Sequence, residues 1–577
     1  MSADEAPPPA PDESPEGAPD ADDHSNNASP SSSAAGVVAL GIFVSKILGL
    51  LRERAVAFYF GVGAHADVWQ VAFRAPNLLQ NLLGEGTISA AFIPVYSRLI
   101  DEDRPEAAAR FAGAIFGLLC VVVGLVVLAG IALAEPVVAV LAPGYLGDAE
   151  RVAAGTLSIN RFELAVQAVR IIFPMAGILV LSAWALGILN SHRQFFVPYV
   201  APALWNVAII GTLIGGAYFL SGTPGAPDAL TSDALSRLLL IACFGAVGGG
   251  LLQFGIQLPF VWQHLDRLYL SISTRVEGVR EAIRAFGPVV AGRGVAQISG
   301  YIDLFLASLL AVGAQSAVRY AQIFYLLPVS LFGISVAASE LPELSRLTTE
   351  RAKTFGTRMR RSIHQIAFLT IPTIVGYLCF GFLVVGLLLR TGQFDAQSNW
   401  LVYIVLGGYA LGILATTVSR LLQNAFYALN DAKTPARLAV VRVVISTAIA
   451  VPLMLWLDTT AVPDLVPVAT DDPLFLGALG LSLGASVGAW VEFILLRRAL
   501  RTHLPTLSLV DGRTMATLTG LAIAAALPAL GLWALLAGAS IWVVAPLVGG
   551  TYIVVYLGSA WLLNRPELMA WVDRFVG

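Results

Sequence analysis

The sequence predicts an all-α polytopic membrane protein with about fourteen transmembrane helices. Three observations lead to this fold class. Apolar residues make up 57% of the 577 residues, only 13% are charged, and the mean hydropathy is +0.76. Apolar runs long enough to cross a bilayer follow one another along most of the chain. Basic residues collect in every second connection between these runs, as expected when alternate loops face the cytoplasm.

The first 35 residues form an acidic segment that is rich in Pro and Ser and has no large apolar side chain after Met1. Such a segment cannot bury enough surface to fold alone, so we expect a disordered tail. Its eight acidic residues and its lack of Lys and Arg distinguish it from a secretory signal, which begins with a basic region. Residues 1–35 are therefore expected to be a dispensable cytoplasmic tail.

The remaining chain divides into apolar runs separated by polar or Gly/Pro-containing loops. A helix needs about 20 residues to cross roughly 30 Å of hydrocarbon. Runs of that length lie near 36–60, 68–97, 111–134, 162–190, 198–220, 237–262, 284–312, 316–340, 363–389, 398–427, 436–457, 474–496, 514–537 and 541–563. This pattern predicts a bundle of about fourteen helices.

The loops that follow even-numbered runs hold the basic clusters. These residues are Arg98, Arg104, Arg110, Arg193, Arg267, Arg275, Arg280, Arg284, Arg346, Arg351, Lys353, Arg358, Arg360, Arg361, Lys433, Arg437, Arg497, Arg498, Arg501 and Arg513. The loop at 458–473 follows an odd-numbered run and has four Asp with no Lys or Arg. The positive-inside rule then places both termini in the cytoplasm.

The composition also narrows the class of function. The three cysteines, Cys120, Cys243 and Cys379, lie in separate apolar runs and suggest neither a disulfide framework nor a metal site. No phosphate-binding loop of the ATPase type is present in the sequence. We therefore expect no cofactor and no metal, and any transport is expected to draw on the membrane potential or an ion gradient.

The stretch "VAFRAPNLLQNLLGEG", residues 71–86, is unusually polar for a membrane span. At 100° per residue, one narrow face of this helix carries Gln70, Arg74, Asn77, Asn81 and Glu85. Exposure of this stripe to lipid would be costly, so it should face the bundle interior or a water-filled cavity, and Pro76 is expected to kink the helix. The alternative is that Arg74 and Glu85 only pair with neighbouring helices.

Three further sets of polar residues lie in other predicted spans. They are Lys46, Arg52 and Glu53 in the first, Arg293, Gln297 and Asp303 in the seventh, and Arg319 and Gln322 in the eighth. Concentration in spans one, two, seven and eight is what two similar halves facing a central cavity would produce. Two alternatives stay open, because Arg293 could pair with Asp303 and Arg319 could extend to the outer interface.

The segment "SKILGLLRERAVAFYFGVGAHADVWQVAFRAPNLLQNLLGEGTISAAFIPVYSRL" closely resembles the N-terminal region of the MurJ (MviN) family, the lipid II flippases of bacterial cell-wall synthesis. "ELPELSR" and "SRLLQNAFYALNDAKTPARLAVVRVV" resemble the same family in order and spacing. The resemblance implies the fold of the multidrug/oligosaccharidyl-lipid/polysaccharide exporters. It implies two six-helix lobes, 36–262 and 263–510, around a cationic cavity, and a two-helix lipid-tail groove at 511–577.

The resemblance also implies which residues bind substrate. Positions at which the family places functional polar groups are occupied by Ser45, Arg52, Asp67, Arg74, Asn77 and Glu85. The chain departs from the family pattern where arginines are replaced by Lys46, Gln80 and Asn81, and where an Asp-Arg pair is replaced by Gln322 and Ile323. We expect Arg293 and Arg319 to compensate for the missing cations. The predicted cavity set is Ser45, Lys46, Arg52, Glu53, Asp67, Arg74, Asn77, Gln80, Asn81, Glu85, Arg293, Gln297, Arg319 and Gln322.

The function implied is that of a flippase and not an enzyme. It would move lipid II, or a similar undecaprenyl-pyrophosphate-linked substrate, to the outer leaflet of the bacterial cytoplasmic membrane by alternating access. Membrane lipids are expected partners, nucleic acid is not, and the chain is expected to be monomeric. The alternatives are an exporter of another polyprenyl-linked or anionic substrate, a multidrug antiporter of the same fold, a membrane-embedded transferase and a non-transporting scaffold.

Overall fold

The computed structural model of the chain describes residues 32–569, except 224, 226, 266, 335–351, 430, 469, 471, 504–510 and 537. Across these residues the regular structure is helical, and the only β pairing is one isolated bridge between Ala461 and Phe475. The predicted all-α fold class is confirmed for this part of the chain. Residues 1–31 of the expected tail and residues 346–351 of the basic loop lie outside the described residues.

The first half of the chain folds into helices α1 to α11. Their bounds are α1 Ser32–Phe60, α2 Ala64–Leu83, α3 Glu85–Asp101, α4 Pro105–Ala132, α5 Ala134–Leu141, α6 Asp148–Ala153, α7 Arg161–Ser191, α8 Phe196–Ser221, α9 Ser232–Gly255, α10 Leu258–Trp262 and α11 Val279–Ser308. Short 3-10 turns lie at Pro143–Tyr145 and Pro227–Ala229. Helices α5 and α6 are too short to cross a bilayer and lie in a connection for which the apolar pattern predicts no membrane span.

The second half contains the remaining helices. Their bounds are α12 Ala314–Pro328, α14 Ala352–Leu389, α15 Ala396–Ala410, α16 Ile413–Ala428, α17 Lys433–Leu457, α18 Gly477–His503, α19 Gly512–Leu535 and α20 Ile541–Leu562. A π-helical segment, Val329–Ile334, continues α12, and a 3-10 turn lies at Val462–Asp464. Each of the fourteen predicted apolar runs therefore coincides with helical structure in its described residues.

Nine helices in the described part of the chain are long and apolar enough to cross a membrane, and ten if the bent pair α15 and α16 forms one span. The chain is therefore a multi-pass membrane protein. Helices α1, α2, α11 and α12 are not among these spans. They carry most of the ionisable residues predicted from the polar stripes, which lowers their hydropathy.

Three predicted runs are each divided into two helices, and one of them, the run at 237–262, is divided between α9 and α10. The run at 68–97 is interrupted at Gly84, between α2 and α3, whereas α2 continues through Pro76. The run at 398–427 bends by 43° between Ala410 and Ile413. In each case the break lies inside one apolar run, so the apolar pattern alone does not predict it.

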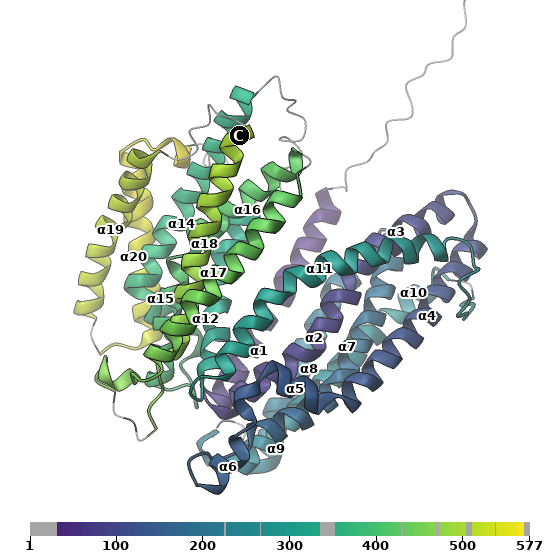
Figure 1. Cartoon of the computed structure of the whole chain (residues 1–577), viewed down its shortest axis with the longest axis horizontal. Helices are drawn as coiled ribbons and strands as arrows, with labels where there is room; N and C mark the ends of the chain where they lie inside the picture. Colours follow the sequence, from purple (N-terminus) through teal and green to yellow (C-terminus); the bar gives the residue numbers. More distant parts are fainter. Residues whose placement is uncertain are drawn as a thin grey trace, which may run out of the picture.

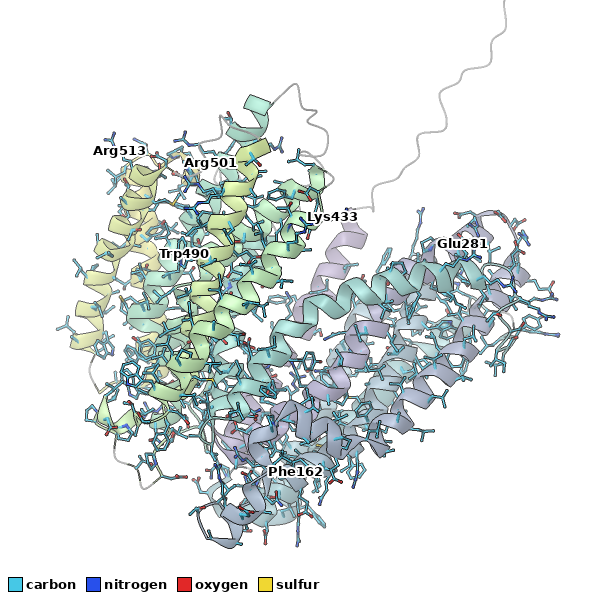
Figure 2. All side chains as sticks on the ribbon, in the orientation of Figure 1. Phe162, Glu281, Lys433, Trp490, Arg501 and Arg513 are labelled. Carbon is cyan, nitrogen blue, oxygen red and sulfur yellow. The ribbon has the colours of Figure 1, made fainter. Side chains whose placement is uncertain are left out.

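The helices form two groups, which Figure 1 shows on the right for α1 to α10 and on the left for α12 to α20. We call these the N-terminal and C-terminal groups. They lie close together at the end where α2 and α12 begin, and they diverge toward the end where α1 begins and α18 ends. Lys433, Arg501 and Arg513 mark the diverging end in Figure 2, and Phe162 marks the opposite end.

Helix α7 lies at the centre of the N-terminal group, where it packs against α2, α3, α4 and α9. Most of its span is buried, including the fully buried Trp184, whose indole N–H donates to the carbonyl oxygen of Ala112 on α4 at 3.1 Å. This indole hydrogen bond satisfies a polar group that would otherwise be unpaired in an apolar interior. The neighbouring helices of the N-terminal group are thus arranged around one buried helix.

In the C-terminal group, α17 and α18 approach closely along a row of glycines. Gly480, Gly484 and Gly488 recur every four residues on α18, and a Cβ at any of them would meet atoms of α17 at less than 3 Å. Small residues at this spacing let two helix backbones come together, which increases van der Waals contact where no hydrophobic effect drives association. The glycine row therefore fixes the α17–α18 pair.

Helix α11 connects the two groups. Near its start, Val279 and Ala282 belong to the apolar core of the N-terminal group, whereas Leu306 and Ala307 near its end belong to that of the C-terminal group. The connection before α11 is held by exposed ion pairs, including Arg104 Nη2 to Glu277 Oε2 at 2.6 Å, and hydrogen bonds from Arg104 lower the pKa of Glu277. Because exposed pairs contribute little stability, the apolar packing at both ends places α11.

Helices α19 and α20 pack against α14. Pro372 of α14 cannot donate a backbone hydrogen bond to the carbonyl oxygen of Phe368, and the hydroxyl of Tyr556 on α20 donates to that oxygen at 2.8 Å. Tyr552 donates to the carbonyl oxygen of Pro372 at 2.8 Å. The two tyrosines thus satisfy polar backbone groups that lipid could not, which ties α20 to the C-terminal group.

Candidate functional site

A cavity of about 290 Å³ lies between the two helix groups and has walls from both. Its polar lining residues are Arg52, Glu53, Gln70, Arg74, Asn77, Gln80, Asn81, Asp303, Gln315, Arg319 and Gln322. The polar stripe of α2 therefore faces an interior cavity, as its periodicity predicted. Eight of the fourteen predicted residues line it: Arg52, Glu53, Arg74, Asn77, Gln80, Asn81, Arg319 and Gln322.

Glu53 of α1 links the two helix groups across this cavity. Its Oε1 lies 2.5 Å from Nη2 of Arg52 and 3.6 Å from Nη2 of Arg319, which belongs to α12. Arg52 also donates to Oδ1 of Asn206 at 3.2 Å, and its guanidinium lies 4.8 Å from the centre of the Trp205 ring. One carboxylate thus faces two guanidinium groups, and Arg319 lies in the cavity instead of at the outer interface.

Arg74 of α2 is positioned by residues of α11. Its guanidinium lies 5.2 Å from the centre of the Tyr301 ring, and the Tyr301 hydroxyl donates to the carbonyl oxygen of Arg74 at 3.0 Å. A side chain at Gly300 would displace the guanidinium from this position. Asp303 also attracts Arg74 electrostatically. These contacts hold a cation at the boundary between the two groups.

The described lining residues include three arginines, two acids and six side-chain amides. Glu53 pairs with Arg52 and Arg319, and Asp303 attracts Arg74 electrostatically, so three arginines exceed two acids in the lining. The arrangement therefore leaves positive charge and amide N–H groups for a ligand. Planar guanidinium groups bind phosphates through paired hydrogen bonds, so the cavity is suited to a phosphate-bearing anion.

Ser45 and Lys46 do not line this cavity. They line a neighbouring pocket of about 350 Å³ within the N-terminal group, together with residues of α7, α8 and α9. Gln80 lines both spaces, so the pocket and the cavity are adjacent. Lys46 and Glu53 are seven residues apart and lie on one face of α1. This face lines the neighbouring pocket at Lys46 and the central cavity at Glu53.

Asp67 also lies outside the cavity, at the end where the two groups meet. Its Oδ2 accepts a hydrogen bond from the backbone N–H of Gly313 at 2.7 Å, and its Oδ1 accepts from the N–H and the hydroxyl of Ser316 at 2.9 and 2.8 Å. The acceptor is thus a carboxylate of α2 that satisfies free N–H groups at the start of α12. Asp67 caps a helix of the opposite group.

A buried ion pair supports Asp67. Arg161 of α7 is 1% exposed and donates from Nε to Oδ2 of Asp148 at 2.6 Å and from Nη2 to Oδ1 at 3.0 Å, while its Nη1 lies 3.8 Å from Asp67. The Tyr145 ring stacks under the guanidinium, and its hydroxyl donates to Gln315 of α12. These contacts close the cavity at the end that Phe162 marks in Figure 2.

Arg54 forms another link near the closed end. It donates from Nη1 to the carbonyl oxygens of Leu387 and Leu388 at 3.2 and 2.9 Å, at the last turn of α14, and stacks on Trp542 of α20 at 5.0 Å. The last carbonyl groups of a helix have no partner within it and favour a cation. Arg54 therefore joins α1 to α14 and α20.

Three predicted residues fall where side chains are not described. These are Glu85, Arg293 and Gln297. Only their backbone is described, and it is helical, at the start of α3 and in the middle of α11. The compensation expected from Arg293 therefore stays a prediction.

Several residues of the site are missing from the predicted set. Asp303, Gln315, Gln70 and Trp205 line the cavity, and Arg161 and Asp148 close its end. Gln70 lies on the polar face predicted for α2, and Asp303 is among the polar residues of the seventh predicted span, but neither is in the predicted cavity set. Arg161 and Asp148 lie near the starts of helices, where charged residues are common. No signal in the sequence therefore distinguishes them from ordinary surface residues.

The described part of the chain contains no group of three or more His, Cys, Asp and Glu side chains that could hold a metal ion. Histidines and cysteines are also absent from the described lining of the central cavity. The chemistry available in the cavity is binding by guanidinium, carboxylate and amide groups.

Comparison with known proteins gives a consistent result. The sequence model of the family described as "Lipid II flippase MurJ" matches residues 56–554. A curated relative from Rhizobium tropici, "Probable lipid II flippase MurJ", is 31% identical over 457 residues, which cover 78% of this chain and 77% of the relative. Another from Burkholderia cenocepacia, "Lipid II flippase MurJ", is 28% identical over 79% of this chain and 81% of the relative.

Solved structures share the fold. One described as "Lipid II flippase MurJ, inward closed conformation" superimposes with a TM-score of 0.67 at 21% identity, covering 92% of this chain and 99% of that one. An inward-facing multidrug resistance transporter of the MATE family and MOP superfamily superimposes with a TM-score of 0.56 at 15% identity, covering 83% of this chain and 100% of that one. The helix arrangement is therefore that of the MOP superfamily.

Proposed function

The chain belongs to the MurJ family of lipid II flippases, and we propose that it carries lipid II across the bacterial cytoplasmic membrane. The family resemblance in the sequence is thereby confirmed, and the family is one of transporters and not of enzymes. The observation that best supports the substrate is the cavity in which Arg52, Arg74 and Arg319 come together from both helix groups. No bond needs to be broken for transport.

The pyrophosphate of lipid II is the part that we assign to this cavity. A pyrophosphate leaves water only where charge-assisted donors replace its hydration, and guanidinium groups provide paired donors. Arg319 extends into the cavity from α12, the helix in which Gln322 and Ile323 replace the Asp-Arg pair that the resemblance implies. It therefore supplies a cation close to the position of the missing arginine. Binding of the anion would weaken repulsion between Arg52 and Arg319, which share one carboxylate.

Alternating access follows from the two ends of the cavity. The helix groups meet at Asp67 and Arg161 and diverge toward Arg501 and Arg513 (Figure 2). The positive-inside rule assigns the diverging end, with its basic loops, to the cytoplasm. The headgroup would then load from the cytoplasmic leaflet, and rocking of the groups would open the Asp67 end outward while the lipid tail stays in the membrane.

The proposed architecture has fourteen spans, with both termini in the cytoplasm. The polar helices α1, α2, α11 and α12 would complete the spans, because charges that face an interior cavity need not meet lipid. The lobes would be residues 36–262 and 263–510, with α11 packed on both, and residues 511–577 would form the groove for the lipid tail. The membrane potential or an ion gradient would supply the energy.

This topology can be tested with single cysteines at two exposed threonines. With Cys120, Cys243 and Cys379 replaced by alanine, Thr459→Cys should react with an impermeant maleimide in intact cells, because its loop is acidic and external. Thr502→Cys should react only after the cells are permeabilised. The reverse pattern would invert the topology and the proposed direction of transport.

Other functions make different demands on the cavity. A multidrug antiporter for cationic drugs needs free acids, whereas this cavity has more arginines than acids and its Glu53 is paired with Arg52 and Arg319. An exporter of another polyprenyl-linked anion would use the same cations, and a non-transporting scaffold would need none of them. A functional assay separates these alternatives from lipid II transport.

The direct test of function is complementation. In cells depleted of their own lipid II flippase, this chain should restore growth and the appearance of lipid II on the outer leaflet. Arg501→Ala, an exposed arginine remote from the cavity, should complement equally well, whereas Arg74→Ala should not. A chain that inserts in the membrane at normal levels but restores neither growth nor lipid II exposure would contradict the proposal.

A further inference from the structure

Helix α1 runs from the diverging end of the molecule to the closed end and packs on both helix groups (Figure 1). Near its start, Gly41 lies against Tyr199 of α8 in the N-terminal group. Ala57 near its end and Val62 just after it are buried in the apolar core of the C-terminal group. The end of α1 therefore lies between the two groups, and contacts made there must break if the groups separate.

Two segments meet at this place, and we call them together the clasp. They are residues 54–61 of α1 and its end, and residues 387–394 at the end of α14 and after it. The backbone N–H of Gln393 donates to the carbonyl oxygen of Phe58 at 2.9 Å. The side chain of Gln393 donates to Oδ1 of Asp228, which also belongs to the N-terminal group, at 2.9 Å. The clasp thus joins a loop of the C-terminal group to two segments of the N-terminal group.

Each segment of the clasp has a glycine where a side chain would collide with the other segment. Gly61 and Gly392 both have a φ of +58°, a conformation that favours glycine. A Cβ at Gly61 would overlap the carbonyl oxygen of Gln393, and a Cβ at Gly392 would overlap that of Phe58. Because each oxygen belongs to the opposite segment, these collisions exist only while the segments touch. A side chain at either glycine would therefore oppose closure in addition to straining the local backbone.

Arg54 joins the same two segments one turn before Phe58. Its Nη1 donates to the carbonyl oxygens of Leu387 and Leu388 at 3.2 and 2.9 Å, and its guanidinium lies 5.0 Å from the centre of the Trp542 ring. Hydrogen bonds from a charged donor are stronger than those between neutral groups. Separation of α1 from α14 would break both of them.

We propose that the clasp is an outer gate of the transport cavity, which holds the closed end shut and must release before the cavity opens outward. This inference rests on the alternating access of the proposed function. The clasp is separate from the contact of Asp67 with α12, because it joins α1 to α14 whereas Asp67 lies on α2. The two glycines let the segments meet backbone to backbone, and Arg54 adds charge-assisted hydrogen bonds. Weakening any of these contacts favours the outward-open form.

The test measures how readily the cavity is reached from outside the cell. Gln70 lines the cavity on α2, three residues after Asp67 at the closed end. Gln70→Cys is introduced into the full chain with Cys120, Cys243 and Cys379 replaced by alanine. An impermeant maleimide should label this cysteine slowly in intact cells, because the cavity is closed on that side.

Weakening the clasp should raise this labelling rate. Gly392→Ala and Arg54→Met should each raise it about 10-fold, because each shifts the population toward the outward-open form. Gly222→Ala is the matched control for the glycine, since Gly222 has a φ of +73° but no described residue lies within 4 Å of an added Cβ. Arg390→Met, at an exposed arginine of the same segment, is the control for Arg54. Both controls should stay within about twofold of the original rate.

The outcomes separate the outer gate from the proposed substrate. Unchanged labelling in both clasp variants at normal expression would overturn the inference. An equal rise in Gly222→Ala would also overturn it, because backbone strain would then open the cavity without the clasp. Arg54→Met keeps the test decisive if Gly392→Ala lowers the folded yield. Lipid II takes no part in the labelling, so a failure of complementation would contradict the proposed function without changing these results.

Discussion

Replacing Arg161 with methionine should cause a large loss of folded protein. The change removes the buried partner of Asp148 and the cation nearest to Asp67, and leaves two carboxylates that are almost fully buried. An unpaired buried charge of this kind costs about 3–5 kcal/mol. The measurement is the thermal stability and the monodisperse yield of the purified variant in detergent.

Arg151 provides the matched control for this prediction. It lies 3.8 Å from the same carboxylate, Asp148, but is 56% exposed, so Arg151→Met should change stability by less than about 1 kcal/mol. The double variant Arg161→Met with Asp148→Leu should recover part of the loss, because fewer buried charges remain unpaired. Equal and small losses for Arg161→Met and Arg151→Met would show that the buried network does not stabilise the closed end.

Lipid II binding should fall about 10- to 100-fold when Arg74 or Arg319 is replaced with alanine. Each change removes charge-assisted hydrogen bonds to phosphate of about 1.5–3 kcal/mol. Lysine at either position should restore only part of the affinity, because the paired donors of guanidinium are lost. The measurement is lipid II affinity in detergent, taken together with thermal stability.

Stability separates binding from a structural role. Arg319 pairs with Glu53, so a purely structural arginine would lower thermal stability before it altered affinity. Arg501→Ala, which removes an exposed charge at the diverging end, should leave both quantities unchanged. Normal stability and normal lipid II affinity in the Arg74→Ala, Arg319→Ala double variant would exclude the cavity as the pyrophosphate site.

The sequence by itself determined the fold class, the helix positions and the polar face of α2. An apolar run of about 20 residues in a membrane folds as a helix, because its backbone N–H and C=O groups must form hydrogen bonds within the run. The 100° repeat then shows which residues share a face, and so Arg74, Asn77 and Asn81 line one cavity. The family followed from several motifs in order, and this too needs no tertiary structure.

The tertiary structure decided which groups meet across that cavity. Periodicity places Lys46 and Glu53 on one face of α1, but only the packing of α1 shows that one lines a side pocket and the other meets Arg319. Asp67 belongs to the predicted set, yet it caps α12 at the closed end. The helical repeat shows only which residues share a face of one helix. The residues that a face contacts in the other group depend on how the helices cross and tilt, and this packing is determined by residues far apart in the chain.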